Sequence, residues 1–114
     1  MILADLENYL VQTIGHTTED LEVNGQHFLV IRNLQIPSGS HAGLNCDIAV
    51  PRTDTNPWIP PSQIHVRPHL TSMGQNSSRA SSIGSEWQYL SRRFDEPPNP
   101  KKYYARILSI LAEL

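Results

Sequence analysis

The sequence predicts an α+β domain in which helices near the two ends of the chain cover an antiparallel sheet. Two observations lead to this fold class. Apolar residues recur at helical spacing near both ends, whereas the stretches between them alternate between apolar and polar residues or carry hairpin turn signals. The length of 114 residues fits a single domain, residues 1–114, with one hydrophobic core.

The first helix is expected at the start of the sequence. Its apolar residues follow one another at intervals of three or four, the period of an amphipathic helix: Leu3, Leu6, Leu10 and Ile14. Gly15 comes next and readily ends a helix. We therefore expect this apolar stripe to pack against the core.

A hairpin should follow this helix. Asn-Gly at residues 24–25 predicts a tight turn, because both residues tolerate the positive φ angles that such a turn needs. We expect a short strand at residues 21–23 before the turn and a longer strand at residues 27–36 after it. The Pro-Ser-Gly-Ser sequence at residues 37–40 then ends the longer strand as a further turn.

Two more strands complete a four-stranded antiparallel meander. Residues 44–50 alternate strictly, and the expected inward residues are Leu44, Cys46, Ile48 and Val50. Pro51 should end this strand, because proline has no N–H for the next sheet hydrogen bond. In the strand expected at residues 63–67, Ile64 and Val66 face inward. The expected outward residues of that strand are Gln63, His65 and Arg67.

A proline-rich crossing joins the last two of these strands. Residues 56–61 read Asn-Pro-Trp-Ile-Pro-Pro, which excludes a helix or a central strand and leaves a fixed extended segment. Trp58 should fold over apolar residues. Residues 71–86 are rich in serine, glycine, asparagine and glutamine and predict a long loop of the kind that is often functional.

The pattern of residues 86–94 fits two structures. Trp87, Leu90 and Phe94 would share a helical face, whereas Trp87 and Tyr89 would share the face of a strand. Asn99 and Pro100 then suit the cap and the first position of a C-terminal helix. The expected apolar stripe of that helix is Tyr104, Ile107, Leu108, Leu111 and Leu114.

Composition excludes several classes of function. A net charge of −2 and one cysteine argue against nucleic-acid binding and a disulfide framework. The sequence has no metal-ligand spacing, no glycine-rich phosphate loop and no apolar run long enough for a membrane span. The first ten residues carry acidic and no basic side chains, unlike a signal peptide, so we expect a cytoplasmic protein without cofactors.

Three stretches resemble the ubiquitin-conjugating enzyme (UBC) superfamily, and most of all its divergent prokaryotic group E. Residues 30–39 resemble the second strand and its Pro-x-Gly turn. Residues 46–51, followed by the prolines of residues 56–61, resemble the next strand and the proline-rich segment of the superfamily. Residues 87–93, Trp-Gln-Tyr-Leu-Ser-Arg-Arg, resemble the Trp-x-x-x-Ser-Arg-His signature of the group. The resemblance implies a UBC-like fold over most of the chain.

Two departures from the family pattern bear on the chemistry. Arg93 stands where the signature ends in histidine, and Pro68-His69-Leu70 replaces the His-Pro-Asn that precedes the nucleophile. The resemblance places that nucleophile in the loop after Leu70, and no cysteine lies there. Cys46 comes two strands too early and faces inward, so we expect it to pack in the core as a small apolar residue.

Serine is the obvious substitute in that loop, and a serine nucleophile would carry the ubiquitin-like protein as an oxyester. A hydroxyl needs a positioned base, and His69 at the mouth of the loop is the nearest one. The serines of that loop are Ser72, Ser77, Ser78, Ser81, Ser82 and Ser85, and the candidates among them are Ser77, Ser78, Ser81 and Ser82. The alternative is that these serines solvate a flexible loop. Ser91 and Arg92 match the group signature, and Arg92 either serves the site or braces the loop against the sheet.

The resemblance implies two functions. The chain is a transferase of the conjugating type, which receives a ubiquitin-like C-terminus from an activating enzyme without a cysteine thioester, or an inactive UBC-like module that binds either protein. A third reading is a structural adaptor with the same fold and unrelated partners. The first two place a ubiquitin-like protein and an activating enzyme among its partners, with no nucleic acid and no membrane. The association of the group with ubiquitin-like gene clusters implies a bacterial pathway and suggests a role in antiphage defence.

Overall fold

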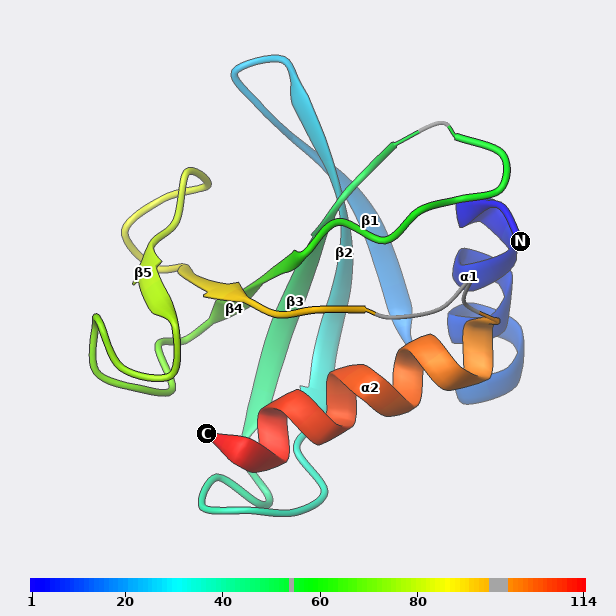
Figure 1. Cartoon of the computed structure of the whole chain (residues 1–114). Helices are drawn as coiled ribbons and strands as arrows, with labels where there is room; N and C mark the ends of the chain where they lie inside the picture. The colour runs from blue at the N-terminus through cyan, green and yellow to red at the C-terminus, as the bar shows by residue number, and fades with distance from the viewer. Residues whose placement is uncertain (54, 95–98) are drawn as a thin grey trace.

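A six-stranded antiparallel sheet with a helical layer against one face makes up the fold (Figure 1). The computed structural model describes residues 1–53, 55–94 and 99–114. The strand order across the sheet is β1-β2-β3-β4-β6-β5. The strands are β1 (Thr17–Val23), β2 (Gln26–Gln35), β3 (Asn45–Pro51), β4 (Gln63–Arg67), β5 (Ser78–Ala80) and β6 (Gln88–Ser91). The predicted α+β class is confirmed, whereas the predicted number of four strands is wrong.

The N-terminal helix begins as α1 (Leu3–Asn8) and continues as the π-helical segment η1 (Tyr9–Ile14). Gly15 ends it at a φ of 92°, and its N–H donates to the carbonyl of Leu10. Leu10 is buried as predicted, but Ile14 is exposed. A π-helical turn takes more residues than an α-helical turn, so Ile14 no longer falls on the face that Leu10 buries.

The Asn-Gly turn lies where the sequence predicts it. Asn24 and Gly25 have φ angles of 51° and 81°, and Val23 is paired with Gln26 across the turn. β1 is longer than the predicted strand at residues 21–23. It is an edge strand, and its first half is largely exposed and polar, so no apolar alternation marks the extra residues.

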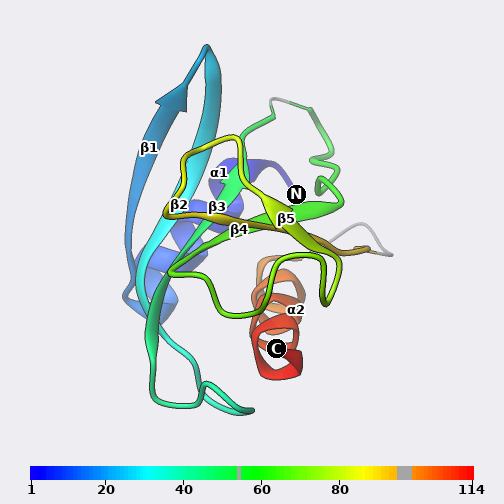
Figure 2. The ribbon, with the colours of Figure 1, turned by 90° about the vertical axis from the view of Figure 1, so that its left-hand side faces the viewer.

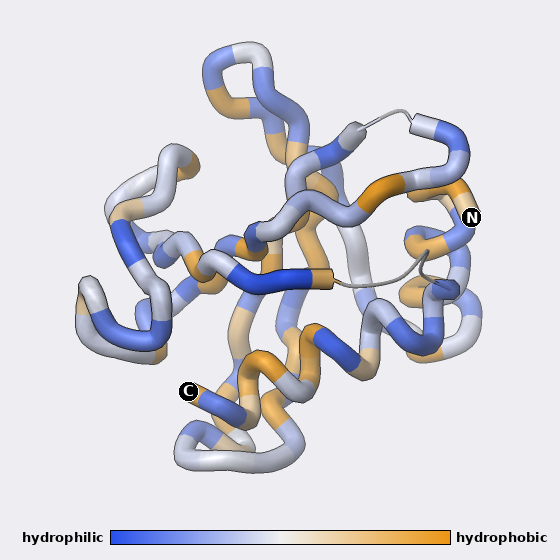
Figure 3. The backbone as a smooth tube through the Cα atoms, viewed as in Figure 1, coloured by the Kyte–Doolittle hydropathy of each residue, from blue (hydrophilic) through white to orange (hydrophobic). Residues whose placement is uncertain are grey.

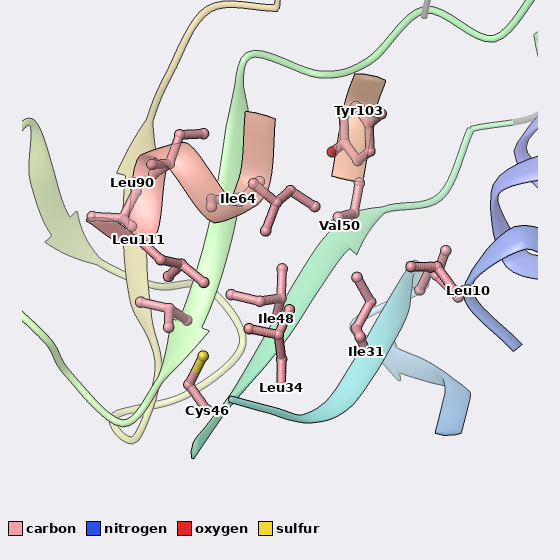
Figure 4. Packing of buried hydrophobic residues seen from close by; sticks show 14 of the residues in the cluster. Leu10, Ile31, Leu34, Cys46, Ile48, Val50, Ile64, Leu90, Tyr103 and Leu111 are labelled. Carbon is pink, nitrogen blue, oxygen red and sulfur yellow. The ribbon is translucent and has the colours of Figure 1, made fainter. Parts of the chain in front are cut away.

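Strand β3 runs through the centre of the sheet. Cys46, Ile48 and Val50 are buried on the face that the helices cover (Figure 4). The prediction for Leu44 is wrong, because Leu44 precedes β3 and is 42% exposed. Ala49, predicted to face outward, is buried in a small apolar cluster on the opposite face.

The proline-rich crossing closes the core from one end. Trp58 is 1% exposed, and its ring packs edge-on against the ring of Tyr103, with centroids 5.0 Å apart. Its backbone N–H donates to the carbonyl of Met1 at 2.7 Å. The prediction that Trp58 folds over apolar residues is therefore confirmed.

The sequence pattern did not define strands β5 and β6. β6 resolves the open choice for residues 86–94 in favour of a strand, and it pairs with β4 and β5. β5 lies within residues 71–86, which were expected to be one long loop. Strands of three and four residues are too short to show alternation, and pairing with their neighbours defines them.

The C-terminal helix α2 (Pro100–Glu113) crosses the strands (Figures 1 and 2). The side chain of Asn99 accepts a hydrogen bond from the N–H of Lys102 at 2.9 Å, which confirms the predicted cap. The buried residues are Tyr103, Ile107, Ile110 and Leu111. The apolar stripe is thus rotated from the prediction, and Tyr104, Leu108 and Leu114 lie at its edge, half-buried. Apolar and polar residues alternate in groups along this helix (Figure 3).

Within the described residues, no helix covers the second face of the sheet. Phe28, Val30, Ala49 and Trp87 are buried there, and Leu21, Val23 and Ile83 pack around them. Since Ile83 belongs to the segment between β5 and β6, that segment covers part of this face. No helix in the described ranges is long and apolar enough to cross a membrane.

Candidate functional site

His65 and Ser81 meet on the helix-free face of the sheet. The Nδ1 atom of His65 lies 2.7 Å from the Oγ atom of Ser81, and its Nε2 atom lies 2.9 Å from the Oε1 atom of Gln63. The backbone N–H of Ile83 donates to the same Ser81 oxygen at 3.1 Å. A hydroxyl, an imidazole and an amide therefore form one hydrogen-bonded chain.

The partners in this chain determine which atoms carry the protons. The Oε1 atom of Gln63 can only accept, so Nε2 of the neutral His65 ring carries the proton and donates it. Nδ1 is then the unprotonated nitrogen, and it accepts the hydrogen bond from the Ser81 hydroxyl. This arrangement directs the Ser81 proton toward a base, as a serine nucleophile requires.

Strand geometry brings the three side chains together. Gln63 and His65 are two residues apart in β4, so they lie on one face of the sheet. Ser81 directly follows β5, which pairs with β6, and β6 pairs with β4. Ile83 anchors the intervening segment on the apolar cluster of this face, which holds Ser81 over His65.

Aromatic rings fix the plane of the imidazole. The rings of Phe28 and Tyr89 pack edge-on against His65, with centroid separations of 5.3 and 5.4 Å. His65 is 1% exposed, and burial lowers its pKa to about 4. The ring is therefore neutral near pH 7. As predicted, His65 lies on the face of β4 opposite Ile64 and Val66. It is nevertheless buried rather than exposed, because this face has an apolar cluster of its own.

His69, the base expected from the sequence, has a different partner. Its Nε2 atom lies 3.0 Å from the backbone carbonyl oxygen of Ser85, to which it can donate. The side chain is exposed and ties the end of the 71–86 segment to the chain that leaves β4. In the part of the chain that the structure describes, no hydrogen bond joins His69 to a serine hydroxyl.

The candidate serines fall into different environments. Ser78 is buried, and its hydroxyl donates to the carbonyl of Ser72 at 2.9 Å. Ser77 has a φ of 55°, and its carbonyl accepts from the N–H of Ser91 at 3.1 Å. Ser82 and Ser91 are exposed. Within the described ranges, Ser81 is the candidate serine that contacts an imidazole.

Arg92 braces the turn that precedes β5. Its Nη1 atom donates to the carbonyl oxygens of Asn76 and Ser91, at 2.6 and 2.7 Å. Its Nε atom lies 3.9 Å from a carboxylate oxygen of Glu113, and only 12% of its side chain is exposed. Of the two roles that the sequence leaves open for Arg92, this geometry favours bracing.

Cys46 lies among the buried side chains of the main core (Figure 4). It is 3% exposed, and burial together with the charge of Asp47 raises the pKa of its thiol to about 12. A thiol in this environment carries almost no thiolate at neutral pH, and thiolate is the nucleophilic form. The expected packing role of Cys46 is confirmed.

The sequence-based predictions missed a charged cluster formed by Asp47 of β3 and Arg67 of β4. The carboxylate of Asp47 accepts from Arg67 at 2.7 and 3.1 Å and from the backbone N–H of Asn33 at 2.9 Å. The guanidinium of Arg67 lies over the ring of Trp87, 4.5 Å from its centroid. Outward alternation could have suggested Asp47 and Arg67 as partners, but only the β3–β4 register sets them opposite each other.

No group of histidine, cysteine and carboxylate side chains in the described ranges could hold a metal ion. Comparison with family models, curated proteins and solved structures gives no match. A function for this chain is therefore inferred from its own residues and their geometry.

Proposed function

We propose that the chain is a conjugating-enzyme-like component of a ubiquitin-like pathway, which receives or positions a ubiquitin-like C-terminus without forming a cysteine thioester. The absence of a cysteine thioester is supported by one observation: Cys46, the only cysteine, is buried in a core strand. Its partners would be a ubiquitin-like protein and a separate activating enzyme, which would carry out the ATP-dependent activation of that protein.

The order of elements supports the first half of the proposal. The chain runs through an N-terminal helix, the strands β1 to β3, a proline-rich crossing with a buried Trp58, and then β4. A long segment that contains β5, then β6 and a C-terminal helix follow. The three motifs that resemble the UBC superfamily fall on β2, on β3 with the crossing, and on β6. The segment after Leu70, where the resemblance puts the nucleophile, is mostly exposed and accessible to a partner.

A second candidate is a module that binds a ubiquitin-like protein or the activating enzyme without chemistry of its own. The geometry of His69 favours this alternative, because the imidazole contacts the Ser85 carbonyl and not a hydroxyl. The buried, internally bonded hydroxyl of Ser78 favours it as well.

The test is reconstitution with a cognate activating enzyme and ubiquitin-like protein from the same genome, together with ATP. We expect the chain to associate with the charged activating enzyme in size-exclusion chromatography. A covalent adduct that survives thiol reductant but is cleaved by hydroxylamine or base supports a receiving role. Association without an adduct supports the binding module, and absence of both contradicts membership in such a pathway.

Cys46→Ala is the matched control for this experiment. The substitution removes the only thiol at a buried position, so association and any adduct should persist. Loss of the adduct in a folded Cys46→Ala protein would contradict the proposal directly, because it would identify the thiol as the acceptor.

A further inference from the structure

We propose that Ser81 is an acyl acceptor, activated by His65 as its base and oriented by Gln63, which takes the acyl group of a thioester. This inference rests on the proposed function for its natural donor, the thioester-linked C-terminus of a ubiquitin-like protein. The site itself stands on hydrogen-bond geometry and can be tested with small acyl donors alone.

Three features set Ser81 apart from an ordinary loop serine. Its hydroxyl points at an unprotonated imidazole nitrogen at 2.7 Å, so a base is already in place. The second nitrogen of that imidazole is held by Gln63 at 2.9 Å, which fixes the tautomer. The base is locked between the rings of Phe28 and Tyr89. Ser81, His65 and Gln63 thus take the roles of nucleophile, base and orienting group, as the three members of a hydrolytic triad do.

The remaining lone pairs of Ser81 also have a defined arrangement. One accepts from the N–H of Ile83, which keeps the oxygen from turning away from His65. Ser81 itself is half-buried and the next residue, Ser82, is exposed, so the segment that carries the hydroxyl lies at the surface. The guanidinium of Arg79 lies over the ring of Tyr89 at 4.3 Å and adds a positive charge to the same face.

The proposed step is a transesterification. The Ser81 Oγ attacks the carbonyl carbon of the thioester while its proton moves to His65 Nδ1. The Oγ–C bond forms, the C–S bond breaks, and His65 returns the proton to the leaving thiolate. The products are an ester on Ser81 and a free thiol, so no oxidant, reductant or metal is needed. A subsequent amine attack would release the acyl group and regenerate the hydroxyl.

The environment of His65 determines how the proton moves in this step. Because burial lowers its pKa to about 4, the ring is unprotonated across the neutral range, with Nδ1 available to Ser81. A base of this pKa is weak, so the proton moves to Nδ1 only as the Oγ–C bond forms, and it returns readily to the leaving thiolate. Gln63 does not touch the reacting atoms and is a positioning residue.

The test uses p-nitrophenyl acetate with the full chain, followed by intact-mass measurement and peptide mapping. We expect an acetyl group on Ser81 that hydroxylamine removes. His65→Gln should slow acetylation by about 100-fold or more, the usual contribution of a general base. Ser85→Ala is the matched control, because Ser85 is an exposed serine of the same segment and the variant keeps the backbone carbonyl that contacts His69. It should react at the wild-type rate.

Two further variants separate a chemical role from a structural one. Ser81→Cys retains a nucleophile next to His65, so it should form the acetyl adduct, now as a thioester, at a rate at least equal to that of the wild type. Gln63→Glu keeps the hydrogen bond to Nε2 but adds a charge, which should shift the pH profile of acetylation to higher pH. A merely structural Gln63 would leave that profile unchanged. Circular dichroism establishes that each variant is folded.

The outcomes distinguish this inference from the proposed function. Acetylation of Ser81 without any transfer from a ubiquitin-like thioester supports the site and overturns the assigned donor. A ubiquitin-like adduct on another residue overturns the Ser81 assignment and leaves the pathway proposal standing. Acetylation that spreads over lysines and loop serines, or is unchanged in Ser81→Ala, overturns the inference.

Discussion

The guanidinium of Arg92 lies 2.6 Å from the backbone carbonyl oxygen of Asn76, so a side chain at the end of β6 holds the turn before β5. Both Asn76 and the next residue, Ser77, have positive φ angles of 51° and 55°. A left-handed conformation is unfavourable for residues other than glycine, and Arg92 helps to hold the chain in it. The edge hairpin that carries Ser81 therefore depends on a long-range contact.

Replacement of Arg92 by alanine should lower the free energy of unfolding by about 1.5–3 kcal/mol, the range for hydrogen bonds to a charged group. Arg92→Lys should recover only part of this loss, since an ammonium cannot reproduce the planar guanidinium. Urea unfolding followed by tryptophan fluorescence measures both values. Equal stability of wild type and Arg92→Ala would show that the turn holds its shape without the arginine.

Ser77→Gly is expected to be tolerated or to stabilise the protein by up to about 1 kcal/mol, because glycine adopts a φ of 55° without strain. The carbonyl that accepts from Ser91 is retained. Thermal unfolding of Ser77→Gly and Ser77→Ala should rank glycine above alanine. The reverse order would mean that the turn has a different backbone conformation in solution. Acetylation of Ser81 should be unaffected in both variants.

Cys46 should resist iodoacetamide in the native protein and react once the protein is unfolded in urea. The thiol is buried in β3, and its raised pKa of about 12 leaves little thiolate at pH 8. Cys46→Ala should lose about 1 kcal/mol through the small cavity that it leaves. Mass spectrometry of the alkylated protein measures the protection. Labelling of the native protein as fast as of a free thiol would contradict the core position.

Stability should fall as the pH decreases from about 6.5 toward 4. The pKa of His65 is lowered from 6.5 to about 4 in the folded protein, so the unfolded chain binds a proton first in this interval. The free energy of unfolding therefore decreases on acidification, and His65 contributes about 3 kcal/mol at most to this decrease. Urea unfolding of wild type and His65→Gln across this range isolates the contribution.

A His65→Gln protein whose stability has the same slope between pH 6.5 and 4 as the wild type would contradict a buried, neutral His65.

Local patterns predicted much of the fold, for identifiable reasons. The cap at Asn99, the turn at Asn24-Gly25 and the burial of Cys46 depend on nearest neighbours and strand alternation, and all were predicted correctly. Ile14 was misplaced because a π-helical segment shifts the helical face, which no apolar period reveals. The short strands β5 and β6 form by pairing across the sheet, so their existence depends on tertiary contacts.

The candidate site was predicted only in part. Ser81 was named among several loop serines, but its partner was expected to be His69. The actual partner, His65, lies 16 residues away in a strand, and their contact depends on how the segment after β5 folds back over the sheet. One signal was present in the sequence: Trp87 and Tyr89 share a strand face, which could have indicated a second apolar face where a histidine is buried.

The most direct test compares Cys46→Ala and Ser81→Ala in the reconstituted reaction with the activating enzyme, the ubiquitin-like protein and ATP. Electrophoresis with and without thiol reductant measures the adduct, and circular dichroism establishes that both variants are folded. We expect Cys46→Ala to form a reductant-resistant, hydroxylamine-sensitive adduct and Ser81→Ala to form none. An adduct in Ser81→Ala together with its loss in Cys46→Ala would instead identify the thiol as the acceptor and exclude Ser81.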